Sequence, residues 1–271
     1  MKQYGAGGLL RCFDPRPLPG FRLVCFPHAG GTAAFFRRWH AALPASVELY
    51  AAQYPGREDR LGDPIPRALG ELADVAAEAL VPLSTAGLIL FGHSMGAALA
   101  YEVAQRLERA GRRPELLVVS GRPAPHRQRV ETVHTGGDEA ILADLRRLGG
   151  TAGAVLDDPA LRELVLPSLR ADYRLIENYW PADPLPTLGC AVAGFSAAGD
   201  TEASDEEMRA WADVTTGRFD SRVFPGEHFY LRDAGPAVVG EVMRLLGHAA
   251  SVSQPRRRLP RQLPGVRGKA G

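Results

Sequence analysis

The sequence predicts an α/β fold built on a mostly parallel sheet. Short runs rich in Val, Leu, Ile and Phe alternate along the chain with longer stretches whose apolar residues recur at helical spacing. The middle runs are apolar at consecutive positions, which is typical of parallel strands that helices cover on both faces. The chain has 271 residues, a length at which such a fold is often a single domain.

Six apolar runs, bounded by Gly, Pro or polar residues, are expected to form the strands. They are 21–26, 47–55, 87–92, 115–121, 189–196 and 218–224. Helical spacing places the apolar residues of 68–83 and of 95–110 on one stripe, and Gly111 is a natural end for the second helix. The alternation therefore predicts right-handed crossovers between parallel strands.

The alternation breaks between about 122 and 188. Two helices are expected there without a strand between them, the first at about 137–148 and the second from a capped start at Asp157-Asp158-Pro159 to about Tyr179. We interpret this insertion as a helical lid over the carboxyl edge of the sheet, where α/β folds bind ligands. The alternative is an extra packing layer far from any site. We thus expect one domain over 1–248, followed by a disordered tail at 249–271 that is rich in Pro and Arg.

Charge and composition exclude several classes of protein. The formal net charge of +1 argues against a nucleic-acid binder, which needs a basic surplus. We find no signal peptide and no apolar run of membrane-spanning length, so we expect a cytoplasmic protein without membrane contact. The three cysteines are widely spaced, which fits neither a disulfide framework nor a zinc site.

The segment Gly92-His93-Ser94-Met95-Gly96 matches the pattern GxSxG, and its context carries more weight than its letters. It follows an expected buried strand directly and opens an expected helix. A sharp turn at this place projects a serine hydroxyl from the sheet edge, and it requires small residues two positions away on either side. Ser94 is therefore the candidate nucleophile, although a plain glycine-rich turn is the alternative.

A serine hydroxyl needs a base, and the base needs a carboxylate that orients it. After this turn the partners follow in the chain order Ser, Asp or Glu, His. His228, in the loop after 218–224, is favoured as the base over His248, which lies at the end of the last helix. Asp200 is the first acid after 189–196 and is favoured over Asp205, which belongs to the acidic start of a helix.

The oxyanion of the tetrahedral intermediate needs amide donors. One is expected from the backbone amide of Met95, at the start of a helix. The other is expected from the backbone amide of Ala29, in the glycine-rich loop after the first strand. His28 has no partners at metal-ligand spacing, so we expect no metal site.

Five segments together resemble the type II thioesterases, the discrete editing thioesterases of polyketide synthases and nonribosomal peptide synthetases. The resemblance covers about 20–246. The segments are FPHAGG at 26–31, QYPGRE at 53–58, LFGHSMGA at 90–97, LPSLRADYRLIENY at 166–179 and PGEHFYL at 225–231. It implies an α/β-hydrolase fold with a helical lid, a triad of Ser94, Asp200 and His228, and oxyanion donors at Ala29 and Met95.

The resemblance also implies a substrate and a partner. Such enzymes remove stalled or wrong acyl groups from the phosphopantetheine arm of acyl or peptidyl carrier domains, through an acyl-enzyme and without a cofactor. A general acyl-CoA or small-ester hydrolase remains an alternative, and so does an inactive hydrolase fold kept as a binding module. We expect a monomer.

Two sets of surface or channel residues follow from this reading. A basic rim would suit an acidic carrier domain, although ordinary solvated arginines are an equal alternative. Its candidates are Arg37, Arg38, Arg57, Arg60, Arg122 and Arg127. Four aromatic residues could line an acyl channel, although core positions are the commoner use of such residues; they are Phe35, Phe36, Trp39 and Tyr179.

Overall fold

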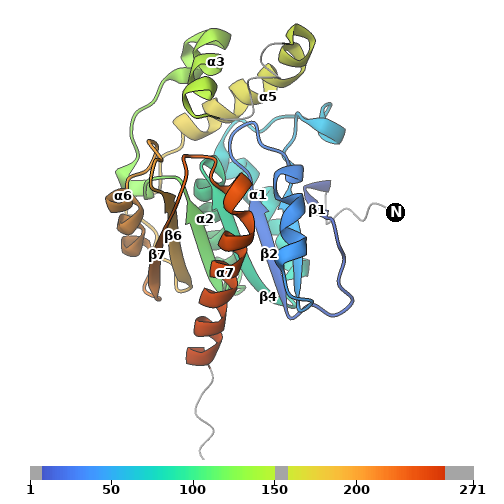
Figure 1. Ribbon diagram of the computed structural model, residues 1–271, viewed down its shortest axis with the longest axis vertical. Coiled ribbons are helices and arrows are strands. Elements are labelled where there is room, and N and C mark those ends of the chain that lie inside the picture. Colours follow the sequence, from blue (N-terminus) through green and yellow to red (C-terminus); the bar gives the residue numbers. More distant parts are fainter. Residues whose placement is uncertain (1–7, 150–157, 254–271) are drawn as a thin grey trace, which may run out of the picture.

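The computed structural model describes residues 8–149 and 158–253. Its centre is a seven-stranded sheet with the order β1-β3-β2-β4-β5-β6-β7, and it has the α/β-hydrolase fold (Figure 1). The strands are β1 (Leu10–Cys12), β2 (Phe21–Phe26), β3 (Val47–Ala52), β4 (Gly87–His93), β5 (Leu116–Ser120), β6 (Ala191–Ala197) and β7 (Phe219–Phe224).

All six predicted strands are present, and β2 to β7 run parallel. The prediction missed β1, which pairs antiparallel with β3 so that Leu10 lies opposite Ala52. This strand is only three residues long. Its single buried residue, Leu10, gives no alternating pattern that could be recognised in the sequence.

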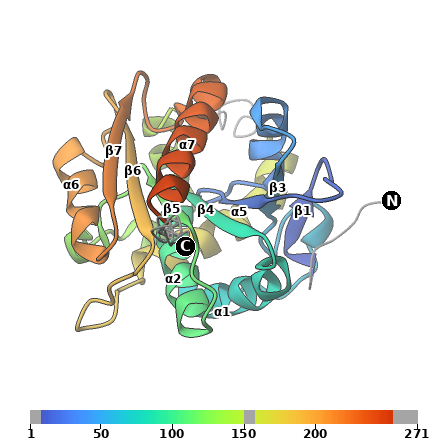
Figure 2. The same ribbon diagram turned by 90° about the horizontal axis from the view of Figure 1, so that it is seen from below.

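Helices cover both faces of the sheet, as the consecutive apolar residues of its strands require (Figure 2). Val24 and Phe26 of β2 pack into the cluster that contains α1 and α2, whereas Leu23 and Cys25 pack into the cluster that contains the 3-10 helix η2 and α7. The helices outside the insertion are α1 (Leu69–Leu80), α2 (Met95–Arg109), α6 (Asp205–Arg209), α7 (Leu231–Ser253) and η2 (Ala33–Ala42).

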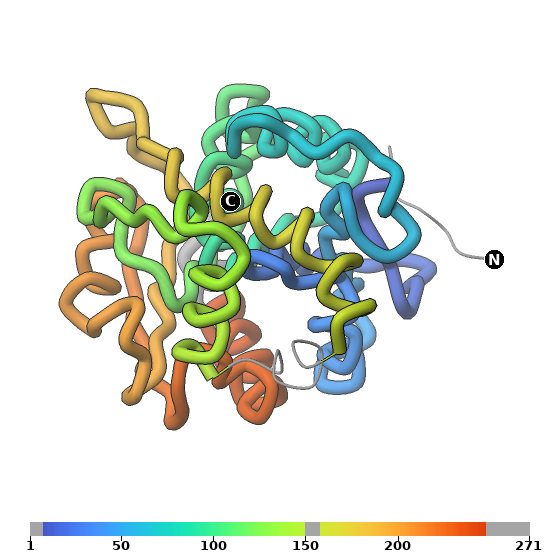
Figure 3. Tube along the Cα trace, turned by 90° about the horizontal axis from the view of Figure 1, so that it is seen from above, coloured from blue at the N-terminus to red at the C-terminus, as the bar shows by residue number. Residues whose placement is uncertain are grey.

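The insertion between β5 and β6 forms a lid, a name we use for its described residues, 122–149 and 158–188. It contains α3 (Gly137–Arg147) and α5 (Pro159–Glu177), which lie above the sheet in Figure 1 and cross over it in Figure 3. The Asp158 side chain caps α5 by accepting hydrogen bonds from the amides of Ala160 and Leu161, as the sequence predicted. The lid has its own small apolar cluster, formed by Ile141, Leu142, Leu145, Leu169 and Tyr173.

The last helix reaches further than expected. Helix α7 continues to Ser253, into the segment 249–271 that the sequence analysis assigned to a disordered tail, and the remainder of that segment lies outside the described residues. The three cysteines all lie in the described part and are free thiols. None of the described helices is long and apolar enough to span a bilayer.

Candidate active site

Ser94 lies on a sharp turn between β4 and α2. Its backbone has φ 54° and ψ −119°, a strained conformation for a residue with a side chain. The amide of Ser94 donates a hydrogen bond of 2.8 Å to the carbonyl of Ser120 at the end of β5, which fixes the turn on the sheet. The nucleophile position predicted from the GxSxG pattern therefore has the geometry that presents a hydroxyl.

The two glycines of the pattern are required by close approach of backbone. A Cβ on Gly96 would lie 2.0 Å from the carbonyl oxygen of Phe26, and a Cβ on Gly92 would lie 2.0 Å from the carbonyl oxygen of Gly96. Helix α2 thus begins in direct contact with the end of β2. A side chain at either position would push the helix and its first residue, Met95, away from the loop that follows β2.

Four of the five predicted site residues line one cavity of about 410 Å³, and they are Ala29, Ser94, Met95 and His228. The lid supplies much of the remaining wall, including Asp144 and Arg147 of α3 and Tyr173 and Ile176 of α5. The insertion therefore covers the candidate site and is not a remote packing layer.

Asp200, the fifth predicted residue, contacts His228. The Nδ1 atom of His228 lies 3.0 Å from Oδ1 and 3.1 Å from Oδ2 of Asp200, and neither side chain is more than 3% exposed. The amide of Glu202 donates a 2.9 Å hydrogen bond to Asp200 Oδ1, which holds the carboxylate toward the ring. Asp205, the alternative, instead begins α6 and pairs with Arg209. The alternative base, His248, has a side chain that lies outside the described part.

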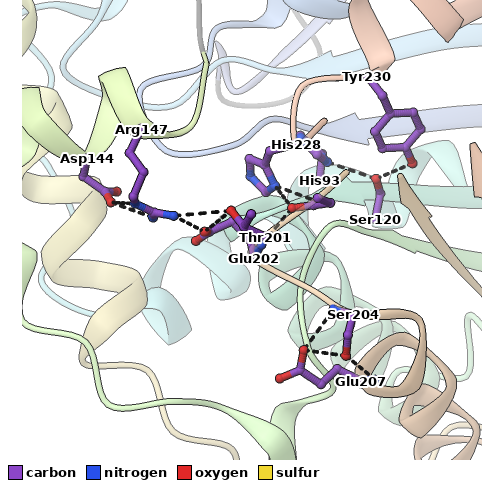
Figure 4. Close-up of polar contacts among 11 residues, drawn as sticks. His93, Ser120, Asp144, Arg147, Thr201, Glu202, Ser204, Glu207, His228 and Tyr230 are labelled. Atoms are coloured by element: carbon purple, nitrogen blue, oxygen red, sulfur yellow. Dashed lines mark hydrogen bonds and ion pairs between the residues drawn. The ribbon is translucent and has the colours of Figure 1, made fainter. Parts of the chain in front are cut away.

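A buried polar network behind the candidate triad went unnoticed in the sequence. His93 Nδ1 lies 3.0 Å from Ser120 Oγ, which lies 2.8 Å from the hydroxyl of Tyr230 (Figure 4). The ring of His93 stands 4.9 Å from that of His228, centroid to centroid. Burial lowers the pKa of His93 well below its ordinary value, so a neutral ring packs against the candidate base His228.

Gly121 lies against His93, Asp200 and His228, and the sequence analysis missed it as well. It has φ +60°, and a Cβ there would lie 2.9 Å from His93 Cε1 and 3.2 Å from both His228 Cε1 and Asp200 Oδ2. The only signal in the sequence is a Ser-Gly pair at the end of the predicted strand 115–121.

An ionic contact joins the lid to the loop that carries Asp200. Arg147 of α3 lies 2.7 Å from both Asp144 of its own helix and Glu202 of the loop after β6 (Figure 4). Because the Glu202 amide also holds Asp200, the lid and the candidate triad share one loop. The Arg147 side chain is half exposed, so this contact contributes little to folding stability.

The structure corrects part of the expected basic rim. Arg57 is only 6% exposed and forms a bidentate ion pair with Asp172 of α5, so it cannot face a partner. Arg122 lines the cavity and donates to Gln128, and Arg60 is turned toward Asp63. Of these partners only Asp172 is distant in the sequence, 115 positions after Arg57. Arg37, Arg38 and Arg127 are exposed.

Three of the four aromatic candidates for an acyl channel are buried in the core, the alternative that the sequence analysis kept open, whereas Phe35 is only partly buried and packs edge-on against His28. Phe36 and Trp39 pack with Phe91 on the face of the sheet that η2 and α7 cover, and Tyr179 is buried beside α2. The aromatic residues that line the cavity are instead Tyr173 and Phe229.

His28 should make folding stability depend on pH. Burial is the main cause that lowers its pKa to about 3, and the nearby charges of Arg232 and Arg57 add to this effect. The unfolded chain protonates at about pH 6.5, so it binds more protons below that pH and stability falls as the pH falls. We expect His28→Phe to remove about 2 kcal/mol of the loss in unfolding free energy between pH 7 and pH 5. Urea denaturation at both pH values measures it, and equal losses in the variant and the parent would contradict it.

Comparison with known proteins agrees with the geometry. The thioesterase domain family matches residues 21–246. The probable cadicidin biosynthesis thioesterase of Streptomyces griseus is 44% identical over 237 residues, which cover 88% of this chain but only 65% of that protein. Thioesterase PikA5 of Streptomyces venezuelae is 42% identical over 88% of this chain and 85% of its own length.

Solved structures give the same result. The type II thioesterase BorB from the borrelidin biosynthetic cluster superposes with a TM-score of 0.81 at 40% identity, covering 88% of this chain and 97% of that one. The RedJ thioesterase of the prodiginine pathway in Streptomyces coelicolor gives a TM-score of 0.77 at 42% identity, covering 83% and 86%. With a family match over most of its length and relatives above 40% identity, this chain belongs to the thioesterase family.

Proposed function

We propose that this protein is a type II thioesterase that hydrolyses stalled or wrong acyl groups from the phosphopantetheine arms of acyl or peptidyl carrier domains. The observation that carries the chemistry is the strained turn at Ser94, placed in one cavity with a His228 that is bonded to a buried Asp200. The choice of substrate is supported by the relatives, of which BorB is described as a type II thioesterase of a biosynthetic cluster.

The reaction follows from the roles of these groups. Ser94 Oγ attacks the thioester carbonyl carbon while His228 takes its proton, and the amides of Ala29 and Met95 donate hydrogen bonds to the oxyanion. The C–S bond then breaks, and the thiol leaves with the proton from His228. Water attacks the acyl-serine with His228 again as base, which releases the acid and restores Ser94.

Thioesters suit this site because their leaving group needs little help. A thiol has a pKa of about 8.5, far below that of an alcohol, so proton donation by His228 is less demanding than in ester hydrolysis. The same groups also cleave esters, and specificity therefore rests on the lid and on docking of the carrier. We further propose that the enzyme acts as a monomer in the reducing cytoplasm, where its three free cysteines stay unpaired.

One comparison tests this function. The same acyl group is offered on a holo-carrier protein, on coenzyme A and on a simple alcohol ester, and kcat/KM is measured for each. We expect the highest value on the carrier protein. Equal or higher efficiency on coenzyme A would favour a general acyl-CoA hydrolase, and equal or higher efficiency on the alcohol ester would overturn the thioesterase assignment.

Asp200→Asn should lower kcat by about 10³- to 10⁴-fold. An amide is neutral, and it favours the tautomer of His228 that cannot accept the serine proton. The matched control is Asp205→Asn, a nearby acid that pairs with Arg209 at the start of α6, and its kcat should stay near that of the parent. A larger loss in the control than in Asp200→Asn would transfer the orienting role to Asp205. Steady-state kinetics on an acyl thioester measure both variants.

A further inference from the structure

Three segments far apart in the sequence meet around the loop between β2 and η2. We call residues 27–31 the oxyanion loop, because the proposed function places an oxyanion donor at Ala29. Tyr54 donates a 3.0 Å hydrogen bond to the carbonyl of Pro27, and Arg57 Nη1 donates one of 3.0 Å to the carbonyl of Gly31. The segment 53–57, which follows β3, therefore holds both ends of the loop.

The third segment comes from the lid. Asp172 of α5 accepts a hydrogen bond of 2.7 Å from the amide of Gly30, in the middle of the oxyanion loop. Ala29 also packs against the lid cluster that contains Leu169 and Tyr173 of the same helix. Helix α5 thus contacts the loop through a charge at Gly30 and through apolar surface at Ala29, the residue that carries the proposed donor.

The Asp172 carboxylate is fully engaged. Its Oδ2 accepts from Gly30 and, at 2.7 Å, from Arg57 Nη1, while its Oδ1 accepts at 2.8 Å from Arg57 Nη2. The Asp172 residue is 1% exposed and Arg57 is 6% exposed. A buried ion pair is a weak source of stability, because desolvation of both charges offsets their attraction. The presence of the Arg57–Asp172 ion pair is therefore better explained by its orienting effect on the loop than by a contribution to folding stability.

The Asp172 carboxylate fixes the orientation of the Ala29 amide through its contact with the neighbouring Gly30 amide. The amide of Gly30 belongs to the peptide unit that follows Ala29, and a peptide unit is planar. Holding that unit on Asp172 restricts ψ of Ala29, and the bond from Tyr54 to Pro27 restrains the chain on the other side. The Ala29 amide lies between these two anchors. It is thereby aimed before substrate binds, which is the condition under which an oxyanion donor is effective.

We propose that the Arg57–Asp172 ion pair is a positioning device for the oxyanion loop, and that the Ala29 amide keeps its catalytic orientation only while the lid helix α5 is seated. The inference rests on the proposed function, which assigns the oxyanion donor to Ala29. It makes Asp172 a positioning residue that acts through Gly30. The lid then has two tasks, since it walls the cavity and also completes the electrostatics of the sheet-borne site.

Asp172→Asn tests the device. The asparagine side chain keeps a hydrogen-bond acceptor near Gly30 but lacks the negative charge that pairs with Arg57, so the oxyanion loop becomes more mobile. We expect kcat to fall about 10- to 100-fold with KM within about threefold, because the misplaced donor acts mainly in the transition state. Each preparation is first titrated with a fluorophosphonate, so that kcat refers to labelled Ser94 sites. A merely structural loss would lower the labelled fraction and leave kcat per site unchanged.

A second measurement isolates the oxyanion. A trifluoromethyl ketone analogue of the acyl group forms a tetrahedral adduct with the serine, and its affinity should weaken by the same factor as kcat. Arg57→Lys keeps the charge but loses the two-pronged contact, so it should lie between the parent and Asp172→Asn in both measurements. This variant also decides the matter if Asp172→Asn fails to fold.

The matched control is Glu48→Gln, which breaks another ion pair, between a buried Glu48 and a partly buried Arg22 at 3.1 Å. That pair joins the amino-terminal parts of β2 and β3, at the opposite end of the strands from the site. It should lower stability without changing kcat per site. Unchanged kcat and unchanged inhibitor affinity in both Asp172→Asn and Arg57→Lys would overturn the proposal. A parent protein that fails to hydrolyse acyl thioesters but still binds the ketone would count against the proposed function alone, since ketone affinity still tests the device.

Discussion

Replacing Ser94 with alanine should reduce kcat on an acyl thioester by about 10⁵-fold or more. No other group among the described residues that line the cavity is placed on a comparable turn, and loss of a triad nucleophile typically removes nearly all of the chemical acceleration. The variant should fold normally, because alanine removes a single oxygen and keeps the Cβ. Steady-state kinetics and circular dichroism measure the two effects.

The control for this prediction is Ser84→Ala. Ser84 donates to the carbonyl of Val81 and precedes β4, so it lies at the opposite end of that strand from Ser94. It should keep full activity and full labelling by a fluorophosphonate. Labelling of Ser94→Ala at the rate of the parent would show that another residue is the nucleophile, and it would contradict the proposed mechanism.

Gly96→Ala should cost at least about 3 kcal/mol of unfolding free energy, beyond the usual range for a single added methyl group. The new Cβ would lie 2.0 Å from the carbonyl oxygen of Phe26 and 2.7 Å from that of Pro27, and backbone cannot move aside as a flexible side chain can. Helix α2 would have to separate from β2. Because Met95 opens that helix, activity should fall in any fraction that still folds. Urea denaturation monitored by fluorescence measures the loss.

Gly240→Ala provides the matched control. Gly240 lies on the exposed side of α7, and a Cβ there has no neighbour within 4 Å among the described residues. Alanine loses less backbone entropy in a helix, so this change should stabilise the protein by about 0.5–1 kcal/mol. Equal stability of the two alanine variants would contradict the close approach of α2 and β2.

Local pattern was sufficient for most of the fold. The runs at 21–26 and 87–92 are apolar at consecutive positions because helices cover both faces of β2 and β4, and burial on both faces leaves a strong signal. Strand β1 left none, because it is short and antiparallel at the sheet edge. Helix α7 passed the expected boundary at 248 because composition, which predicted the tail, does not fix where a helix ends.

Some residues of the candidate site could likewise be predicted from local sequence, and others could not. Ser94, Asp200 and His228 could be proposed because each follows a recognisable strand, and parallel strands end at one edge of the sheet. Arg57 was misread as a surface residue because its partner, Asp172, is 115 positions further along the chain. Nothing in the local sequence of either residue distinguishes a buried pair from two solvated charges. Such pairs depend on tertiary packing, which spacing along the chain does not reveal.

The division of labour between sheet and lid constrains how such an enzyme can diversify. The sheet carries the proposed catalytic groups, while α3 and α5 supply much of the wall of the cavity in which we propose that the acyl group binds. New acyl preferences could therefore arise by changes in the lid without disturbing the chemistry. The hydrogen bond from Gly30 to Asp172 sets a limit on this freedom. A lid of different sequence would still need a carboxylate at the position of Asp172. The shape of the lid can therefore change independently of the sheet, but this charge cannot.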